Sequence, residues 1–104
     1  MTEKKYKTLN QFYPFYLSEH QNKTSRVLHF IGTGLVFISL FSAILFHDWR
    51  FFAAIPFLGY GFAWVGHFFF EKNKPATFQY PLFSLLSDFK LFFDLLFGRQ
   101  KFNP

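Results

Sequence analysis

The chain has 104 residues, which is enough for one domain, and 51% of them are hydrophobic, including 20 phenylalanines. A soluble domain of this size buries only part of its surface, so this aromatic content favours a lipid environment. The absence of cysteine excludes disulfides, thiolate metal sites and cysteine nucleophiles. The net charge of +5 comes from basic residues that flank apolar stretches. We therefore expect membrane lipid, and no nucleic acid, as a partner.

The N-terminal segment, about residues 9–20, is predicted to form an amphipathic helix at the membrane surface. Thr8 and Gln11 have the spacing of a capping box at its start. Apolar and aromatic side chains then recur at helical spacing on one face. They are Leu9, Phe12, Tyr13, Tyr16, Leu17 and His20. The polar residues 21–25 are expected to end this helix.

Two uncharged apolar runs follow, at residues 27–46 and 51–70, each twenty residues long. About 20 apolar residues are needed to cross the hydrocarbon core of a bilayer. Only residues 47–50 connect the runs, so the two helices must be antiparallel. The sequence predicts an all-α fold, an integral membrane helical hairpin of two spanning helices with amphipathic N- and C-terminal helices.

Basic residues on the flanks indicate the orientation of this hairpin. Its tip carries Arg50, offset by Asp48, whereas both outer flanks are basic. Those flanking residues are Lys4, Lys5, Lys7, Lys23 and Arg26 before the first run, and Lys72, Lys74, Arg99 and Lys101 after the second. The positive-inside rule therefore predicts that both termini are cytoplasmic.

The last segment, residues 81–97, is apolar but interrupted by polar residues on one arc of a helical wheel. The arc contains Ser84, Ser87, Asp88, Lys90 and Asp94. This pattern favours a helix in the interface with a solvated arc, and a re-entrant helix packed against the hairpin is the alternative. Asp88 and Asp94 are expected on the solvated arc, with a role beside the ligands of a metal site as the alternative. Residues 1–104 are thus expected to form a single membrane domain.

The positions of the histidines indicate a candidate site. His29 is the third residue of the first run and His67 is the fourth from the end of the second, so a hairpin places them at nearly the same depth. His20 lies on the apolar face of the preceding helix, which can fold back over this level. Glu71 follows His67 by four residues and should share its helix face. His47 lies at the opposite end, roughly 27 Å from His29 at 1.5 Å rise per residue.

Three imidazoles and one carboxylate can therefore converge, and His20, His29, His67 and Glu71 are the candidate metal ligands and catalytic residues. Imidazole suits Zn, Cu, Fe and Ni, and a neighbouring carboxylate is typical of non-haem iron, but these residue types do not choose between iron and zinc. An interhelical hydrogen bond between histidines is the structural alternative. Asn22 and Arg26 lie beside this site and are candidates to bind a substrate carboxylate. Arg26 could equally serve only to set the membrane topology.

Two sequence stretches, FYLSEHQNKTSRVLHFIGT and WVGHFFFEKNKPATF, resemble the motifs of the membrane 2-hydroxy fatty acid dioxygenases. The best-known member of this family converts phytosphingosine-derived fatty acids to odd-numbered ones. The chain is shorter than the eukaryotic members and differs from them at Ala63 and after Pro75. It is similar in this to the short bacterial branch, which implies a bacterial inner membrane, or the endoplasmic reticulum for a eukaryotic source.

The resemblance implies an Fe(2+)-dependent enzyme that uses O2 to shorten a 2-hydroxy fatty acid by one carbon. His20, His29 and His67 match the positions expected to bind iron, and Glu71 matches an acidic position that binds the metal or lies beside its ligands. Two other classes of function stay open. One is a non-catalytic membrane protein that binds lipid, and the other is a small haem protein with His29 and His67 as axial ligands. A homo-oligomer is also left open.

Overall fold

The computed structural model describes residues 5–74 and 79–104, and all regular secondary structure in these ranges is helical. Four α-helices and one π-helix follow in chain order. They are α1 (Leu9–Ser18), α2 (Lys23–Phe46), α3 (Trp49–Val65), the π-helix η1 (Gly66–Glu71) and α4 (Pro81–Leu96). The all-helical class predicted from the sequence is confirmed for the described part of the chain.

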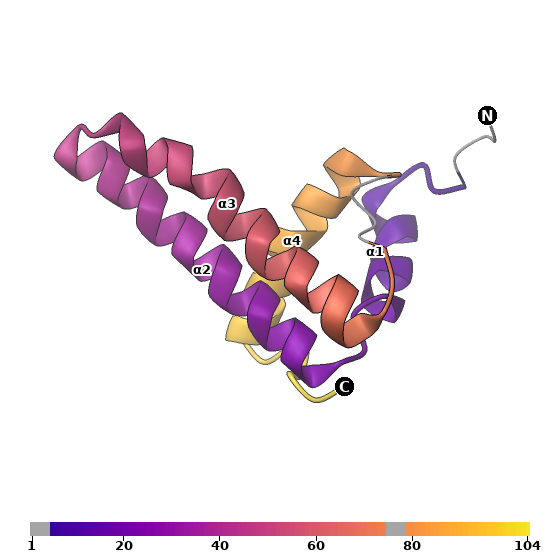
Figure 1. Ribbon diagram of the computed structural model, residues 1–104. Coiled ribbons are helices and arrows are strands. Elements are labelled where there is room, and N and C mark those ends of the chain that lie inside the picture. The colour runs from indigo at the N-terminus through magenta and orange to yellow at the C-terminus, as the bar shows by residue number, and fades with distance from the viewer. Residues whose placement is uncertain (1–4, 75–78) are drawn as a thin grey trace.

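Helices α2 and α3 form a long antiparallel hairpin, and η1 continues directly from α3 (Figure 1). At the tip, α2 ends at His47 in a left-handed conformation with φ of 52°. The Asp48 carboxylate then accepts the backbone N–H of Arg50 at 3.0 Å and caps α3. The segments Lys23–Phe46 and Trp49–Glu71 are long and apolar enough to cross a membrane, and only 33% and 17% of their apolar windows are buried. They begin two to four residues before the predicted runs.

The two arms of the hairpin are in close contact at two glycines. A Cβ atom added at Gly32 would lie 2.8 Å from Cβ of Phe62 and 3.1 Å from the carbonyl oxygen of Leu58. A Cβ atom at Gly66 would lie 2.9 Å from Oγ of Ser25. Small residues of this kind allow helix backbones to pack in close contact. The glycines therefore determine the separation and the register of α2 against α3 and η1.

Helices α1 and α4 pack against each other beside the open end of the hairpin (Figure 1). The predicted N-cap is confirmed, because the Thr8 hydroxyl accepts the Gln11 N–H at 3.2 Å, whereas the Gln11 side chain accepts the Lys7 N–H and does not complete the capping box. The core between the helices is mainly aromatic, and its buried members are Phe12, Tyr13, Tyr16, Tyr80, Leu91 and Leu95.

A buried polar contact joins α1 to the end of α4. The Tyr13 hydroxyl donates to Asp94 at 2.7 Å, Arg99 donates to the same carboxylate at 2.7 Å, and Lys90 lies 3.5 Å from it. Burial acts to raise the pKa of Asp94, but the hydrogen bonds from Arg99 and Tyr13 outweigh it and hold the pKa below its ordinary value. The negative charge of Asp94 is thus compensated by Arg99 and Lys90.

Most of the polar arc of α4 faces inward and only Lys90 is exposed, which corrects the prediction of a solvated arc. Ser84, Ser87 and Asp94 are 4%, 0% and 3% exposed. The outward face is apolar instead, and its exposed residues include Leu82, Leu86, Phe93, Leu96 and Phe97. The helical wheel identified the arc correctly but not its direction, because α1 and α2 pack on the polar side of α4.

The close approach at Gly32 gives a stability prediction. In Gly32→Ala the new methyl group would meet backbone and Cβ atoms that cannot move freely, and such overpacking costs about 1–3 kcal/mol. Gly61→Ala on α3 is the matched control, because a Cβ atom there meets nothing within 4 Å. Thermal unfolding in detergent should show a lower midpoint for Gly32→Ala and an unchanged or higher midpoint for Gly61→Ala. Equal midpoints would contradict the packing described here.

Candidate metal centre

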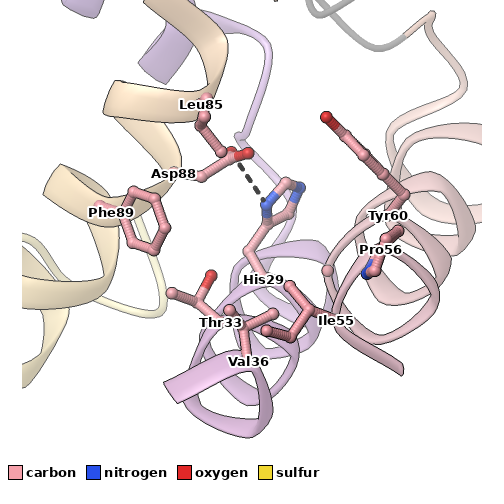
Figure 2. A pocket seen from close by; sticks show the side chains of 10 residues that line it. His29, Thr33, Val36, Ile55, Pro56, Tyr60, Leu85, Asp88 and Phe89 are labelled. Atoms are coloured by element: carbon pink, nitrogen blue, oxygen red, sulfur yellow. Dashed lines mark ion pairs between the residues drawn. The ribbon is translucent and has the colours of Figure 1, made fainter. Parts of the chain in front are cut away.

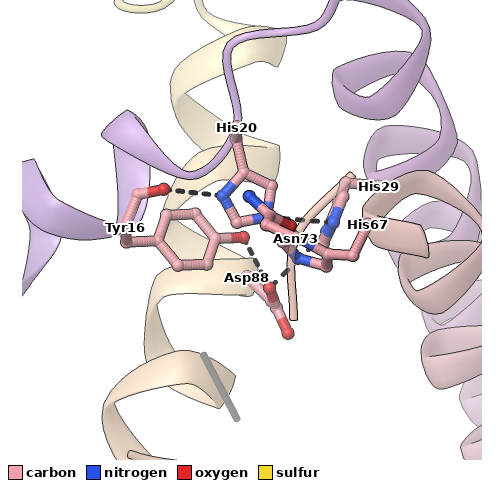
Figure 3. Close-up of polar contacts among 6 residues, drawn as sticks. All are labelled: Tyr16, His20, His29, His67, Asn73 and Asp88. Atoms are coloured by element: carbon pink, nitrogen blue, oxygen red, sulfur yellow. Dashed lines mark hydrogen bonds and ion pairs between the residues drawn. The ribbon is translucent and has the colours of Figure 1, made fainter. Parts of the chain in front are cut away.

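Three histidine rings from three segments meet near the open end of the hairpin (Figure 3). His20 lies in the turn between α1 and α2, His29 lies on α2 and His67 lies on η1, and they are 0%, 6% and 2% exposed. The Nε2 atoms of His20 and His29 are 3.0 Å apart. The ring of His20 is centred 4.4 Å from each of the other two rings. The convergence expected from the sequence is therefore present for all three histidines.

The Nδ1 atoms of these rings face hydrogen-bond acceptors outside the centre. His20 Nδ1 donates to the Tyr16 carbonyl oxygen at 2.6 Å. His67 Nδ1 lies 2.6 Å from Asn73 Oδ1, and Asn73 Nδ2 donates to the Glu19 carbonyl at 3.1 Å. Because the amide nitrogen of Asn73 is used for Glu19, its oxygen must accept from His67. This assignment leaves Nε2 of His20 and of His67 with a lone pair for a shared cation.

The π-helix η1 explains how Asn73 reaches His67. The backbone N–H groups of Lys72 and Asn73 both bond to the His67 carbonyl, the latter at 3.0 Å. Lys72 adopts a left-handed conformation with φ of 60°, which turns the chain back toward the histidine. Short π-helical segments occur frequently at functional sites. Here the wider turn lets the side chain of Asn73 lie beside Nδ1 of His67.

The burial of the centre favours neutral imidazole. Burial lowers the pKa of His20 well below its ordinary value, and the neighbouring His29 and His67 act in the same direction. Burial likewise raises the pKa of Tyr16 well above its ordinary value, with Asp88 adding to the effect. His20 is therefore neutral at pH 7, as a metal ligand must be, and the Tyr16 hydroxyl stays protonated.

Glu71 does not join the histidines. Its two carboxylate oxygens accept the backbone N–H groups of Gln21 and Asn22, at 3.1 and 2.8 Å. The group of side chains able to share a metal ion in the described part of the chain consists of His20, His29 and His67. The sequence predicted a helix face shared with His67 but not these two backbone donors, which hold the carboxylate at the turn before α2. Glu71 instead fixes the turn that carries His20.

Asn22 and Arg26 also have structural contacts. The Asn22 side chain caps α2 by accepting the Ser25 N–H at 3.2 Å. Arg26 is 2% exposed and donates to the carbonyl oxygens of His20 and Lys101, at 2.6 and 2.8 Å. Both residues thus lie close to the centre, as predicted, and the contacts seen here hold the His20 turn and the C-terminal tail in place.

An apolar cavity of about 180 Å³ adjoins the centre between α2, α3 and α4 (Figure 2). His29 and Asp88 lie at one part of its wall, and the rest is mainly aliphatic or aromatic. The other lining residues are Thr33, Val36, Ile55, Pro56, Gly59, Tyr60, Leu85 and Phe89. This shape and lining suit an alkyl chain whose polar end lies at His29.

The donor set suits a transition metal. Imidazole nitrogens bind such ions at about 2.0–2.1 Å, which requires nitrogens roughly 3–3.5 Å apart. One nitrogen from each of the three rings lies within 4.8 Å of the other two, so a small adjustment of the side chains satisfies this requirement. Three neutral imidazoles suit iron as well as zinc or copper.

Two residues near the histidines were not predicted as part of the site, because Tyr16 was placed only on the apolar face of α1 and Asn73 in a polar exit from the second run. Asp88 was expected on the solvated arc, and a place beside the metal ligands was the alternative. For Asn73 no signal in the sequence indicated the contact, because it depends on the π-helix. The neighbouring Pro75 and Ala76 of the second motif lie outside the described residues.

Together, the fold and the site define a small all-helical protein with two candidate membrane spans and a buried three-histidine group able to hold a metal ion. Residues 6–100 match the family model described as "2-hydroxy-palmitic acid dioxygenase Mpo1-like". The chain belongs to this family, as the two motifs in the sequence predicted. Searches of the curated proteins and of the solved structures gave no match.

Measurements of metal content can test whether the histidines bind a metal ion and Glu71 does not. Glu71→Gln keeps an acceptor for one backbone N–H but loses the charge, so we expect a lower unfolding temperature, a cost of about 1 kcal/mol, and unchanged metal stoichiometry. His29→Ala removes a nitrogen of the centre and should lower the stoichiometry. Elemental analysis of both purified variants beside the unchanged protein measures this. Loss of metal from Glu71→Gln would restore Glu71 as a ligand.

Proposed function

We propose that the protein is an iron(II)-dependent dioxygenase that shortens 2-hydroxy fatty acids by one carbon. The observation that carries this proposal is the buried three-histidine group beside an apolar cavity. The family to which the chain belongs is described by the same substrate class. The candidate catalytic residues are therefore His20, His29 and His67, with Fe(2+) as the cofactor and a fatty acyl substrate and O2 as reactants.

The proposed reaction balances without a further reductant. A 2-hydroxy acid R–CH(OH)–COOH and O2 give R–COOH, CO2 and H2O. The bond between C1 and C2 breaks, both carbons lose electrons, four in total, and O2 accepts them. Ferrous iron, when bound, supplies coordination positions for O2 and for the substrate oxygens.

The chain itself contributes ligands, orientation and exclusion of water. His20, His29 and His67 would hold the metal through Nε2, and their burial keeps the centre dry. The cavity would bind the alkyl chain against Val36 and Ile55, so that C1 and C2 end beside His29. In this proposal Arg26 acts on the centre by holding the His20 carbonyl.

We further propose that α2 and the α3–η1 segment cross a membrane with both termini on the cytoplasmic side. The exposed surface of the hairpin supports this, because Phe41, Leu45 and Phe57 are 67%, 72% and 81% exposed. Such large apolar side chains are stable in lipid and costly in water. The centre would then lie near the cytoplasmic boundary, where a fatty acid can enter from the bilayer.

The geometry argues against the haem alternative. The rings of His29 and His67 are centred 5.3 Å apart, and the ring of His20 lies within 4.4 Å of both. This arrangement leaves no space for a porphyrin plane between His29 and His67. A non-catalytic lipid-binding role remains the competing hypothesis, and the assay below distinguishes it from the proposed reaction.

The proposed activity can be measured directly. Detergent-solubilised protein supplied with ferrous iron, O2 and 2-hydroxypalmitate should yield the C15 acid and CO2, detected by mass spectrometry. His67→Ala should abolish the product, and His47→Ala, at the hairpin tip, should not. Palmitate without the hydroxyl should not be consumed. A protein that binds the fatty acid but forms no C15 acid would support the non-catalytic role instead.

The cavity gives a prediction about chain length. Val36→Phe would fill part of it, and each methylene that loses its burial costs about 0.8 kcal/mol, so exclusion of two lowers kcat/KM roughly tenfold. This loss should appear for long 2-hydroxy acids and be smaller for short ones. Ile38→Phe, at a position 62% exposed on the same helix, is the matched control and should leave the preference unchanged. An unaltered preference in Val36→Phe would place the alkyl chain elsewhere.

A further inference from the structure

Asp88 on α4 lies beside the histidine group, in contact with Tyr16 and His29 (Figure 3). Its Oδ1 lies 3.6 Å from Nδ1 of His29, which is within ion-pair range although longer than a hydrogen bond. The same oxygen accepts the Tyr16 hydroxyl at 2.5 Å. The phenol therefore holds the carboxylate in place beside the histidine.

The charge of Asp88 is compensated differently from that of Asp94 on the same helix. Asp94 has Arg99 and Lys90 within ion-pair distance. In the described ranges of the chain, Asp88 has His29 as its ion-pair partner. Its side chain is 25% exposed beside an apolar cavity, where an uncompensated carboxylate is unfavourable. A cation bound by the three imidazoles would supply the missing positive charge.

We propose that Asp88 is a positioning residue for the metal centre, oriented by Tyr16 and acting through His29. A carboxylate beside the outer nitrogen of a metal-binding histidine fixes the tautomer and makes the ring a stronger ligand. Asp88 thus lies beside Nδ1 of His29, although at a longer distance than the 2.6 Å at which the Tyr16 carbonyl and Asn73 accept from Nδ1 of His20 and of His67. Each imidazole then presents Nε2 to the centre. This inference rests on the metal site of the proposed function, but it does not depend on the reaction.

The chain contains a matched control for this contact. The pair of Tyr13 and Asp94 also joins α1 to α4 through a phenol and a carboxylate, at 2.7 Å, and it touches no histidine of the centre. Changes at this pair weaken the packing of the two helices alone. Changes at Tyr16 and Asp88 should weaken both the packing and the metal site.

The test is a titration of the purified protein with Co2+, monitored by its visible absorption bands, beside thermal unfolding of each metal-free sample. Asp88→Asn keeps an acceptor for Tyr16 but loses the charge, and should weaken Co2+ binding about 10–100-fold and shift the bands. Tyr16→Phe should give a smaller change in the same direction. Asp94→Asn and Tyr13→Phe should lower the unfolding temperature and leave both the affinity and the bands unchanged.

Three results would overturn the proposal: an unchanged Co2+ affinity in Asp88→Asn, an equal loss in Asp94→Asn, or no Co2+ binding by the unchanged protein. If Asp88→Asn does not fold, Asp88→Glu takes its place in the test. This variant keeps the charge and should fold. Its Co2+ affinity should lie between that of the unchanged protein and that of Tyr16→Phe. If both single variants, Asp88→Glu and Tyr16→Phe, bind Co2+ as tightly as the unchanged protein, the position of the carboxylate does not affect the metal site and the proposal is wrong. A protein that binds Co2+ as described but does not shorten fatty acids would contradict the proposed function alone.

Discussion

The close contact between the two arms of the hairpin is the constraint on which the centre depends. Gly32 lies against Phe62 and Gly66 lies against Ser25, with no room for a further carbon atom at either position. His29 precedes Gly32 by less than one helical turn, and His67 directly follows Gly66. The glycine contacts therefore set the separation of these two imidazoles as well as that of the helix backbones. A larger residue at either glycine would move the rings apart along with the helices.

The centre is also the place where distant segments of the chain are joined. The acceptors for the Nδ1 atoms of His20 and His67 come from the end of α1 and from the turn after η1, and α4 contributes a carboxylate beside His29. Glu71 and Arg26 hold the turn that carries His20 from two sides. None of these contacts lies within a single helix. The geometry of the histidines is therefore a property of the assembled fold and not of any single helix.

The sequence allowed the hairpin and the common level of His29 and His67 to be predicted, because both follow from the lengths of two apolar runs and their short connection. The role of Glu71 could not be predicted in the same way. Its carboxylate accepts the backbone N–H groups of Gln21 and Asn22, and the position of that turn depends on how α1 folds back over the hairpin. The inward position of Asp88 was only the alternative to a solvated arc, for another reason. A helical wheel shows that polar residues share one side, but only the neighbouring helices decide whether that side faces inward.

The direction of α4 links the environment of the protein to its candidate site. A helix in water buries its apolar face, whereas α4 buries serine and aspartate residues and exposes Leu82, Leu96 and Phe97. A carboxylate facing lipid would be very costly, so in the proposed membrane setting the polar arc is more stable turned inward. This orientation brings Asp94 to Tyr13 and Asp88 to Tyr16 and His29. The same preference that places apolar side chains on the outside thus delivers a charged group to the interior, where a bound cation would stabilise it.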